Sequence, residues 1–267
     1  MEQITSTANP RIKELVLLCE KSRHRRETGL FVVEGVREIQ NCLQGGFLPC
    51  QVFFCQDIIE EESVAEVFVN QSLQLFSVSD NVYNIIAYRG GTEGLVAVFK
   101  ERKRSLKDIH INVDNPFVVV LEAVEKPGNL GAVLRTADAS SVAAVIVCDP
   151  LTDLYNPNLI RASIGGVFTL PVVICSSQEA CDWLKEKGFQ ILTAQLQDST
   201  VYYDIDFDKP TAAVFGTESK GLTDFWRQQS DRKVMIPMMG KLDSLNVATS
   251  VAILSYEALR QKLQKTE

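Results

Sequence analysis

Short apolar runs that alternate with helix-like segments constrain this chain more than any other feature of its sequence. Residues 117–121, 142–147 and 212–215 hold no polar side chain. Strands that are apolar on both faces are typical of a parallel sheet covered by helices. The sequence therefore predicts an α/β domain with a mostly parallel sheet in residues 113–267. Its other predicted elements are helices after Asn129 and at about 159–164, 179–187 and 245–263, and strands at 191–194 and 234–236.

The first part of the chain repeats this alternation on a smaller scale. A short helix is expected from Pro10, because proline suits the first turn of a helix. A small α/β domain over residues 1–99 and a basic linker over 100–112 are therefore predicted. The expected strands of this domain are 30–33, 52–55, 73–78 and 95–99, and its further helices are 36–43 and 63–69.

Composition excludes several classes of protein. The 267 residues are 46% hydrophobic and 23% charged, as in a folded globular chain. No apolar stretch approaches the ~20 residues that cross a bilayer, and polar residues follow Met1, so we expect a cytoplasmic protein with no membrane partner. The seven cysteines are an odd set without a C-x-x-C pair, which predicts reduced, mostly buried thiols and no metal site.

Positive charge gathers in two places although the net charge of the chain is −7. One cluster is Lys21, Arg23, Arg25 and Arg26, and the other lies within residues 100–107. Such clusters can bind nucleic-acid phosphates, because local rather than net charge decides phosphate binding. A solvated surface or a linker explains each cluster equally well.

The stretch VFGTESKGL, residues 214–222, places two glycines, a carboxylate and a lysine after an apolar strand, where α/β proteins bind ligands. It is not a phosphate loop, because Lys220 precedes Gly221 instead of following it. The turn after residue 121 also lacks the G-x-G-x-x-G of a dinucleotide site.

His24 and His110 have no acid or cysteine at catalytic spacing, so chemistry that depends on histidine is disfavoured.

Three polar turns follow strands of the second domain. The first, EKPGNLGAVLRTADA, contains Asn129, which can cap a helix, and Arg135 in that helix. The second is the glycine turn with Glu218. The third, IPMMGKLDSLNVATSVAIL, contains Ser244 and Asn246. Helix capping, helix dipoles and core packing would explain each turn taken singly.

Together the three turns resemble the motifs of the SpoU (TrmH) RNA methyltransferases of the SPOUT class. NPNLIRASIGGVFTLPVV at 156–173 is also similar, and the likeness spans almost all of 117–263. ETGLFVVEGVREIQNCL at 27–43 resembles, more loosely, a ribosomal-protein-like substrate-binding domain of that family. The matching motif residues are Asn129, Leu130, Gly131 and Arg135; Phe215, Gly216, Glu218, Gly221 and Leu222; and Ile236, Pro237, Met238, Ser244, Leu245, Asn246 and Val247.

The resemblance implies a fold, a cofactor and an assembly. The family fold is a parallel α/β sheet with a deep trefoil knot, which the residues alone would not indicate because knots are rare. Its members bind S-adenosylmethionine bent inside the knot, against main-chain groups, and form homodimers through the knotted domain. By position, the cofactor contacts in this sequence would be Thr193, Ala194, Gly216, Gly221, Ile236, Met238 and Leu245.

The implied reaction is methyl transfer to a ribose 2′-hydroxyl of structured RNA, which needs alignment and proton removal. The family resemblance makes Arg135 the base, assisted by an RNA phosphate. A guanidinium stays protonated up to a pKa above ~12, so Arg135 could instead hold phosphate and polarise the hydroxyl while phosphate or water accepts the proton. Asn129, Glu218, Ser244 and Asn246 would orient Arg135 and the ribose, or hold the loops. The reaction needs no metal.

The target RNA stays open. Ribosomal RNA of the 23S type is favoured for members with an added N-terminal domain, whereas transfer-RNA enzymes share the same motifs. The cluster Lys21, Arg23, Arg25 and Arg26 would hold RNA phosphates without reading sequence. A non-catalytic RNA-binding protein of the same fold is a further alternative. An enzyme with another nucleotide cofactor is disfavoured, because both glycine fingerprints are missing.

Overall fold

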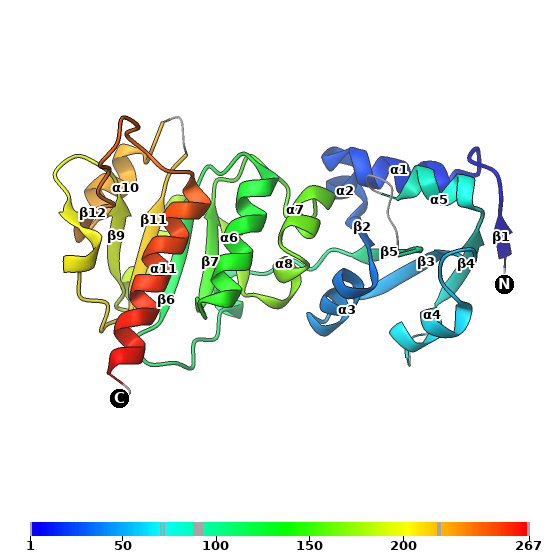
Figure 1. Ribbon diagram of the computed structural model, residues 1–267, viewed down its shortest axis with the longest axis horizontal. Coiled ribbons are helices and arrows are strands. Elements are labelled where there is room, and N and C mark those ends of the chain that lie inside the picture. The colour runs from blue at the N-terminus through cyan, green and yellow to red at the C-terminus, as the bar shows by residue number, and fades with distance from the viewer. Residues whose placement is uncertain (1, 70, 72, 88–92, 218–219, 266–267) are drawn as a thin grey trace. The chain divides into compact units, whose positions relative to one another are not determined.

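The computed structural model describes residues 2–69, 71, 73–87, 93–217 and 220–265. The chain divides into two compact units (Figure 1). The first unit comprises Met1–Lys103 and Asp153–Thr169, and the second comprises Arg104–Thr152 and Leu170–Glu267. Both are α/β, as the sequence predicts. The trefoil knot and the functional domain boundaries stay predictions.

A five-stranded mixed sheet organises the first unit, in the order β1-β4-β3-β5-β2. β1, β4 and β3 run parallel, and β5 is antiparallel to both β3 and β2. All four predicted strands are present, whereas β1, α2 and α5 were not predicted. The bounds are β1 Glu2–Ile4, α1 Pro10–Glu20, α2 Ser22–Thr28, β2 Leu30–Glu34, α3 Val36–Gln44, β3 Pro49–Cys55, α4 Glu61–Val67, β4 Gln74–Val78, α5 Asp80–Ile86 and β5 Leu95–Lys100.

Two short helices of the first unit, α7 (Pro157–Ala162) and α8 (Gly166–Thr169), come from the later part of the chain. Aromatic packing holds this segment: the Phe31 ring stacks on Tyr155, with centroids 4.3 Å apart, and on Phe168, with centroids 5.7 Å apart. The predicted helix at 159–164 therefore exists, but its contacts lie with the smaller unit. The packing of this segment with the first unit could not be predicted from sequence order, because its contacts are long-range.

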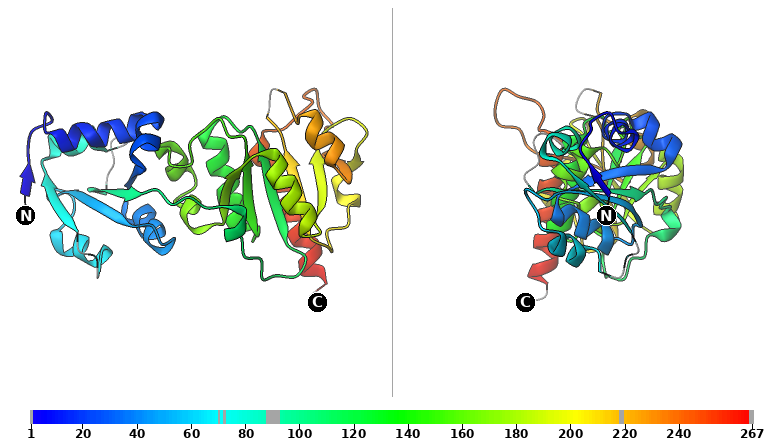
Figure 2. Two further views of the ribbon diagram at one scale, coloured as in Figure 1. Left: turned by 180° about the vertical axis from the view of Figure 1, so that it is seen from behind. Right: turned by 90° about the vertical axis from the view of Figure 1, so that its right-hand side faces the viewer.

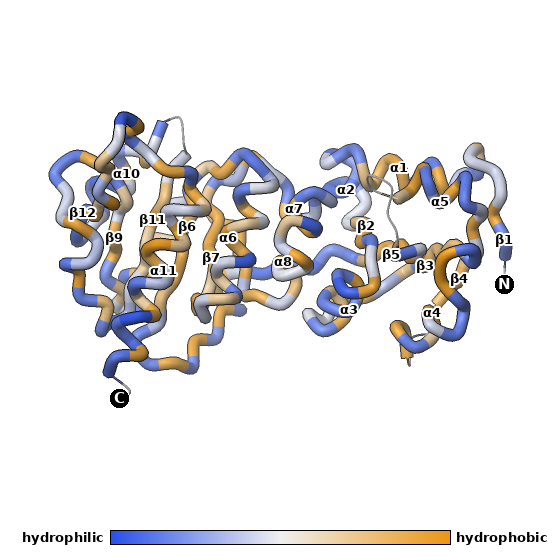
Figure 3. Tube along the Cα trace, in the orientation of Figure 1, coloured by the Kyte–Doolittle hydropathy of each residue, from blue (hydrophilic) through white to orange (hydrophobic). Residues whose placement is uncertain are grey.

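The second unit is built on a seven-stranded sheet in the order β10-β12-β9-β11-β6-β7-β8. Every described strand pair in it is parallel, which confirms the predicted sheet. The strands β6, β7 and β11 are buried throughout. Their mostly hydrophobic residues are coloured orange in Figure 3. The bounds are η1 Leu106–Asp108, β6 Phe117–Glu122, α6 Pro127–Ala139, β7 Ala144–Cys148, β8 Val172–Cys175, α9 Ser177–Glu186, β9 Gln190–Ala194, β10 Thr200–Val201, η2 Tyr202–Asp204, β11 Thr211–Phe215, α10 Asp224–Gln229, β12 Arg232–Met235 and α11 Val247–Gln264.

Helices cover both faces of this sheet. α6 and α11 lie side by side on one face, and α9 and α10 lie on the other (Figure 2). Because all the strands run parallel, their carboxyl ends share one edge. The three motif turns follow β6, β11 and β12, and β9 lies between β11 and β12 in the sheet. The topology therefore gathers the motif turns at one edge.

Part of the predicted basic linker packs against the second unit. Ser105 and Asp108 form a reciprocal capping box around η1, and Leu106 and Ile111 pack against the core in which Ile109 is buried. The charged stretch therefore ends in an ordered segment. Among the described residues, no helix is long and apolar enough to span a bilayer.

Candidate active site

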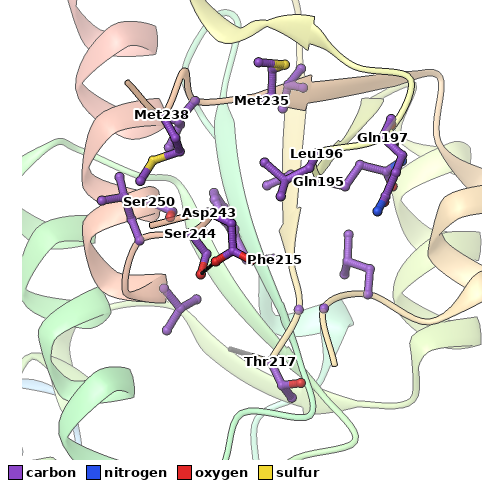
Figure 4. Close-up of a pocket in the computed structure, with 18 of the residues that line it drawn as sticks. Gln195, Leu196, Gln197, Phe215, Thr217, Met235, Met238, Asp243, Ser244 and Ser250 are labelled. Carbon is purple, nitrogen blue, oxygen red and sulfur yellow. Dashed lines mark hydrogen bonds between the residues drawn. The ribbon is translucent and has the colours of Figure 1, made fainter. Parts of the chain in front are cut away.

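A cavity of about 290 Å³ lies at the carboxyl edge of the second sheet, between the ends of β9, β11 and β12 and the start of α11 (Figure 4). Ser244, one of the predicted catalytic residues, lies in its wall and donates a hydrogen bond from Oγ to Asp243 Oδ1 at 3.2 Å. Residues from all four segments meet here although they are far apart in sequence. The predicted cofactor residues in the wall are Ala194, Gly216, Gly221, Ile236, Met238 and Leu245.

Thr193 is the exception among the predicted cofactor residues. Its side chain is fully buried, and its Oγ1 donates a hydrogen bond to Ser230 Oγ at 2.9 Å. Successive side chains of a strand point to opposite faces, so only one of two neighbours can face the cavity. Ala194 is that neighbour. The Thr193 side chain joins β9 to the residue that follows α10, so only its main chain is left for the predicted cofactor contact.

The glycine turn that follows β11 is tight and presents its main chain to the cavity. Gly221 N–H donates to Thr217 O at 2.9 Å, and Lys220 N–H donates to Thr217 Oγ1 at 3.1 Å. Gly221 has φ +66°, a left-handed conformation that favours glycine. A Cβ on Gly216 would lie 2.2 Å from the Gly221 carbonyl carbon, so no larger residue fits there. The predicted catalytic Glu218 lies outside the described residues.

The far end of this turn is held by Glu122, a residue that the sequence argument missed. The buried Glu122 carboxylate accepts hydrogen bonds from Thr223 N at 2.8 Å and Thr223 Oγ1 at 2.7 Å. Thr223 is the N-cap residue of α10. The last residue of β6 thus fixes the start of α10 beside Leu222, which lines the cavity. A carboxylate that ends an otherwise apolar strand was the available signal.

Two further polar residues line the cavity, and each has a buried polar atom that makes no hydrogen bond with the described residues. Gln195 Oε1 and Arg227 Nε are buried and have no hydrogen-bond partner among the residues that the structure describes. Buried polar atoms are nearly always paired, so unpaired ones in a cavity wall suit a polar ligand. Neither residue was predicted from the sequence, because neither belongs to the three motifs.

Asn129 and Asn246, which were predicted to act together, are in contact. Asn246 caps α11 by accepting a hydrogen bond from Ala248 N at 2.9 Å, and its Nδ2 donates to Asn129 Oδ1 at 3.2 Å. Asn129 lines a smaller cavity of about 100 Å³ that shares Gly216 and Thr217 with the larger one. The first and third motifs therefore meet beside the glycine turn.

Arg135 lines neither cavity, and the same is true of Asn246 among the predicted catalytic residues that the structure describes. Arg135 is exposed on α6, six residues beyond Asn129, which is about 9 Å along the helix. It makes no hydrogen bond or ion pair with any residue that the structure describes. Its guanidinium is available to a ligand that approaches from outside. Within the described parts of the chain, no cluster of metal-binding side chains was found.

The basic cluster of the first unit divides into exposed and buried members. Lys21, Arg23 and Arg26 are exposed, as RNA contacts require. Arg25 is buried: its Nε donates to Asp153 Oδ2 at 2.6 Å, and its guanidinium also donates to the Cys19 carbonyl at 3.0 Å. The prediction that Arg25 contacts RNA is therefore corrected, since the residue anchors the 153–169 segment to α1.

Comparison with known proteins agrees with this geometry. Residues 116–256 match the SpoU rRNA Methylase family, and residues 9–97 match the MRM3-like substrate binding domain. The 23S rRNA (uridine(2479)-2'-O)-methyltransferase of Streptomyces viridochromogenes is 31% identical over 271 residues, which cover 98% of this chain and 93% of that protein. The 23S rRNA (guanosine(2553)-2'-O)-methyltransferase RlmP of Bacillus subtilis is 27% identical over 96% of this chain and 98% of its own.

Solved structures extend the likeness to the whole fold. One, described as an RNA 2'-O ribose methyltransferase, is 39% identical, has a TM-score of 0.83, and is matched over 98% of this chain and 99% of its own. The AdoMet-bound rRNA methyltransferase from Sinorhizobium meliloti is 30% identical, with a TM-score of 0.88 over 97% and 98% of the two chains. It holds the cofactor that the motifs predicted. The family match spans more than half of the sequence, and the chain belongs to the SpoU rRNA methylase family.

Proposed function

We propose that this protein transfers a methyl group from S-adenosylmethionine to a ribose 2′-hydroxyl of ribosomal RNA. The observation that carries the proposal is the meeting of the motif turns around one cavity, in a chain that belongs to an RNA methylase family. Bound S-adenosylmethionine would supply an electrophilic methyl group. Ribosomal RNA is favoured over transfer RNA because full-length relatives are named as 23S rRNA enzymes.

The cavity suits a cofactor that has both apolar and charged parts. Leu245 and Ile236 offer apolar walls, and the glycine turn offers main-chain groups. The unpaired Gln195 Oε1 can accept a hydrogen bond, and the unpaired Arg227 Nε can donate one. A guanidinium is the side chain best suited to a carboxylate such as that of the cofactor's amino-acid part. We infer that Gln195 and Arg227 hold polar groups of the cofactor.

Arg227→Ala should weaken S-adenosylmethionine binding by about 10-fold or more, because hydrogen bonds to charged groups contribute about 1.5–3 kcal/mol. Isothermal titration calorimetry measures the dissociation constant. Arg232→Ala is the matched control, since Arg232 is an exposed arginine of β12 that does not line the cavity. Equal affinity in the Arg227 variant and the wild type would remove Arg227 from the cofactor site.

Catalysis would then depend on residues that align the ribose and manage its proton. Asn129 and Asn246 join α6 to the start of α11, so they can fix the orientation of the helix that carries Arg135. Arg135 is free to meet an RNA phosphate or the 2′-hydroxyl.

As the family resemblance implies, we also propose a homodimer through the second unit. Such an assembly would explain why Arg135 lies outside the cavity of a single chain, and light scattering of the purified protein would measure its mass.

The reaction itself can be tested with labelled S-adenosylmethionine. Ribosomal and transfer RNA are purified separately from cells that lack this gene and are offered to the protein, and digestion then locates the label. We expect 2′-O-methyl nucleosides in ribosomal RNA. Label only in transfer RNA would overturn the substrate class. No label in either RNA, from protein that still binds S-adenosylmethionine, would favour a non-catalytic RNA-binding role.

Charge reversal of two exposed arginines should separate RNA binding from cofactor binding. Arg23→Glu with Arg26→Glu removes two exposed positive charges from α2, so RNA affinity should fall and its salt dependence should become less steep. Filter binding at several salt concentrations measures both, while the S-adenosylmethionine affinity should stay unchanged. Arg25 is left intact, because removing one partner of a buried ion pair would destabilise the unit. Unaltered RNA affinity in the double variant would exclude this surface.

A further inference from the structure

Two cysteines face each other across neighbouring strands of the second sheet. Cys148 ends β7, Cys175 ends β8, and the two residues are register partners in the parallel pair. Directly opposed residues project to the same face of a sheet. Neighbouring strands are about 4.8 Å apart, which lies within the Cα separation of about 4.4–6.8 Å that a disulfide requires. The backbone next to the pair is also bonded across the strands, since Asp149 N–H donates to the Cys175 carbonyl at 3.2 Å.

The surroundings give the two thiols different chemistry. Cys175 is half-buried on the strand at the end of the sheet order and precedes Ser176, the N-cap residue of α9, whereas Cys148 is buried. The hydrogen bond from the Cys148 thiol lowers the pKa of Cys175, and an amide hydrogen bond from Ala180 acts in the same direction. The same contact with Cys175, together with burial, raises the pKa of Cys148. Cys175 is thus the more accessible and the more acidic thiol of the pair.

At four other cysteines the thiol pKa is raised, in contrast to the lowered pKa of Cys175. Burial raises the pKa of Cys19 to about 12 and also raises the pKa of Cys50, Cys55 and Cys181. These thiols are poor nucleophiles, because the thiolate is the reactive form. Selective chemistry is therefore expected at Cys175.

We propose that Cys148 and Cys175 form a redox-active dithiol that a low-molecular-weight disulfide converts into a cross-strand disulfide. The Cys175 thiolate attacks one sulfur of the small disulfide, which forms a mixed disulfide and releases one thiolate. The Cys148 sulfur then attacks Cys175 Sγ, its proton passes to the departing thiolate, and the second small thiol leaves. The two cysteine thiols are oxidised by two electrons in total, and the small disulfide is reduced to two thiols.

Hydrogen bonds connect the residues beside this dithiol to α10, the helix that follows the cavity-lining glycine turn. Ser177 lies two residues beyond Cys175, and its Oγ donates to Oδ2 of Asp149, the residue after Cys148, at 2.8 Å. The same Oγ accepts a hydrogen bond from Trp226 Nε1 at 3.2 Å. Trp226 is fully buried in α10, which begins directly after the cavity-lining glycine turn. Closing the disulfide should therefore change the environment of Trp226.

Peptide mapping tests the disulfide on the full-length protein. The reduced protein is incubated with oxidised glutathione, the remaining thiols are blocked with N-ethylmaleimide, and trypsin digestion follows without reductant. Trypsin separates the two cysteines at Arg161, although Cys181 shares the peptide with Cys175. We expect a cross-link between these peptides that persists in Cys181→Ser and disappears in Cys175→Ser. Cys148→Ser should instead trap glutathione on Cys175.

The outcome that overturns the proposal is absence of this cross-link from the folded wild type while glutathione adducts collect on other cysteines. Survival of the cross-link in Cys175→Ser would overturn the pairing. Coupling to the cavity is tested by tryptophan emission in a Trp183→Phe background, which leaves Trp226 as the reporter. Oxidation should shift the emission, and dithiothreitol should restore it. An unchanged emission in cross-linked protein would overturn the coupling.

Discussion

Arg135→Ala should abolish methyl transfer without unfolding the protein or removing its cofactor site. Arg135 is exposed on α6 and makes no hydrogen bond or ion pair with the described residues, so its removal should change stability by less than about 0.5 kcal/mol. It lines neither cavity, so the affinity for S-adenosylmethionine should remain. If Arg135 aligns or activates the 2′-hydroxyl, kcat should fall by at least about 10²-fold. Single-turnover methyl transfer measures that loss, and a thermal melt controls for folding.

Arg135→Lys distinguishes the two possible roles of this residue. Lysine keeps a positive charge, so a phosphate-holding role predicts partial activity with the pH profile of the wild type. A lysine amine loses its proton near pH 10.4, well below a guanidinium, so a general-base role predicts a rate that rises with pH toward that value. Activity of Arg135→Ala within a few fold of wild type would contradict both roles and would move the search for the proton acceptor elsewhere in the chain.

Strands that are buried along their whole length were predicted correctly from the sequence. β6, β7 and β11 are buried on both faces, and a continuous apolar run is the expected pattern for such strands. β8 was missed because only Val172 and Val173 are buried, while Ile174 is exposed and Cys175 half-buried. The placement of α7 and α8 with the first unit was beyond prediction, because it depends on contacts with distant aromatic residues such as Phe31.

In the candidate site, too, some residues were predictable from the local sequence and others were not. Residues inside the motifs, such as Gly216 and Leu245, were found because the motif fixes both residue type and position. Arg25 was misassigned because a basic run does not show which member turns inward to meet Asp153. Arg227 and Glu122 were missed because their significance lies in a three-dimensional relation, an unpaired nitrogen in one case and the capping of α10 in the other.

Gly216→Ala should remove cofactor binding and lower stability together. The added Cβ would lie 2.2 Å from the Gly221 carbonyl carbon and 2.4 Å from Leu222 N, and both of these neighbours are backbone atoms that cannot rotate away. Relief requires the turn to open, which would cost about 1–3 kcal/mol and would displace the wall that Thr217 and Gly221 build. Since the same wall should hold the cofactor, we expect S-adenosylmethionine affinity to fall by at least about 10-fold.

Gly240→Ala is the matched control for this substitution, because Gly240 belongs to the loop of the third motif and a Cβ there would meet no atom within 4 Å. It should leave stability and cofactor affinity close to wild type. Chemical denaturation and calorimetry on both variants separate the steric effect from the general cost of replacing a glycine. If Gly216→Ala bound S-adenosylmethionine like the wild type, the cofactor could not depend on this turn, and the inference that its main chain forms the cofactor wall would fail.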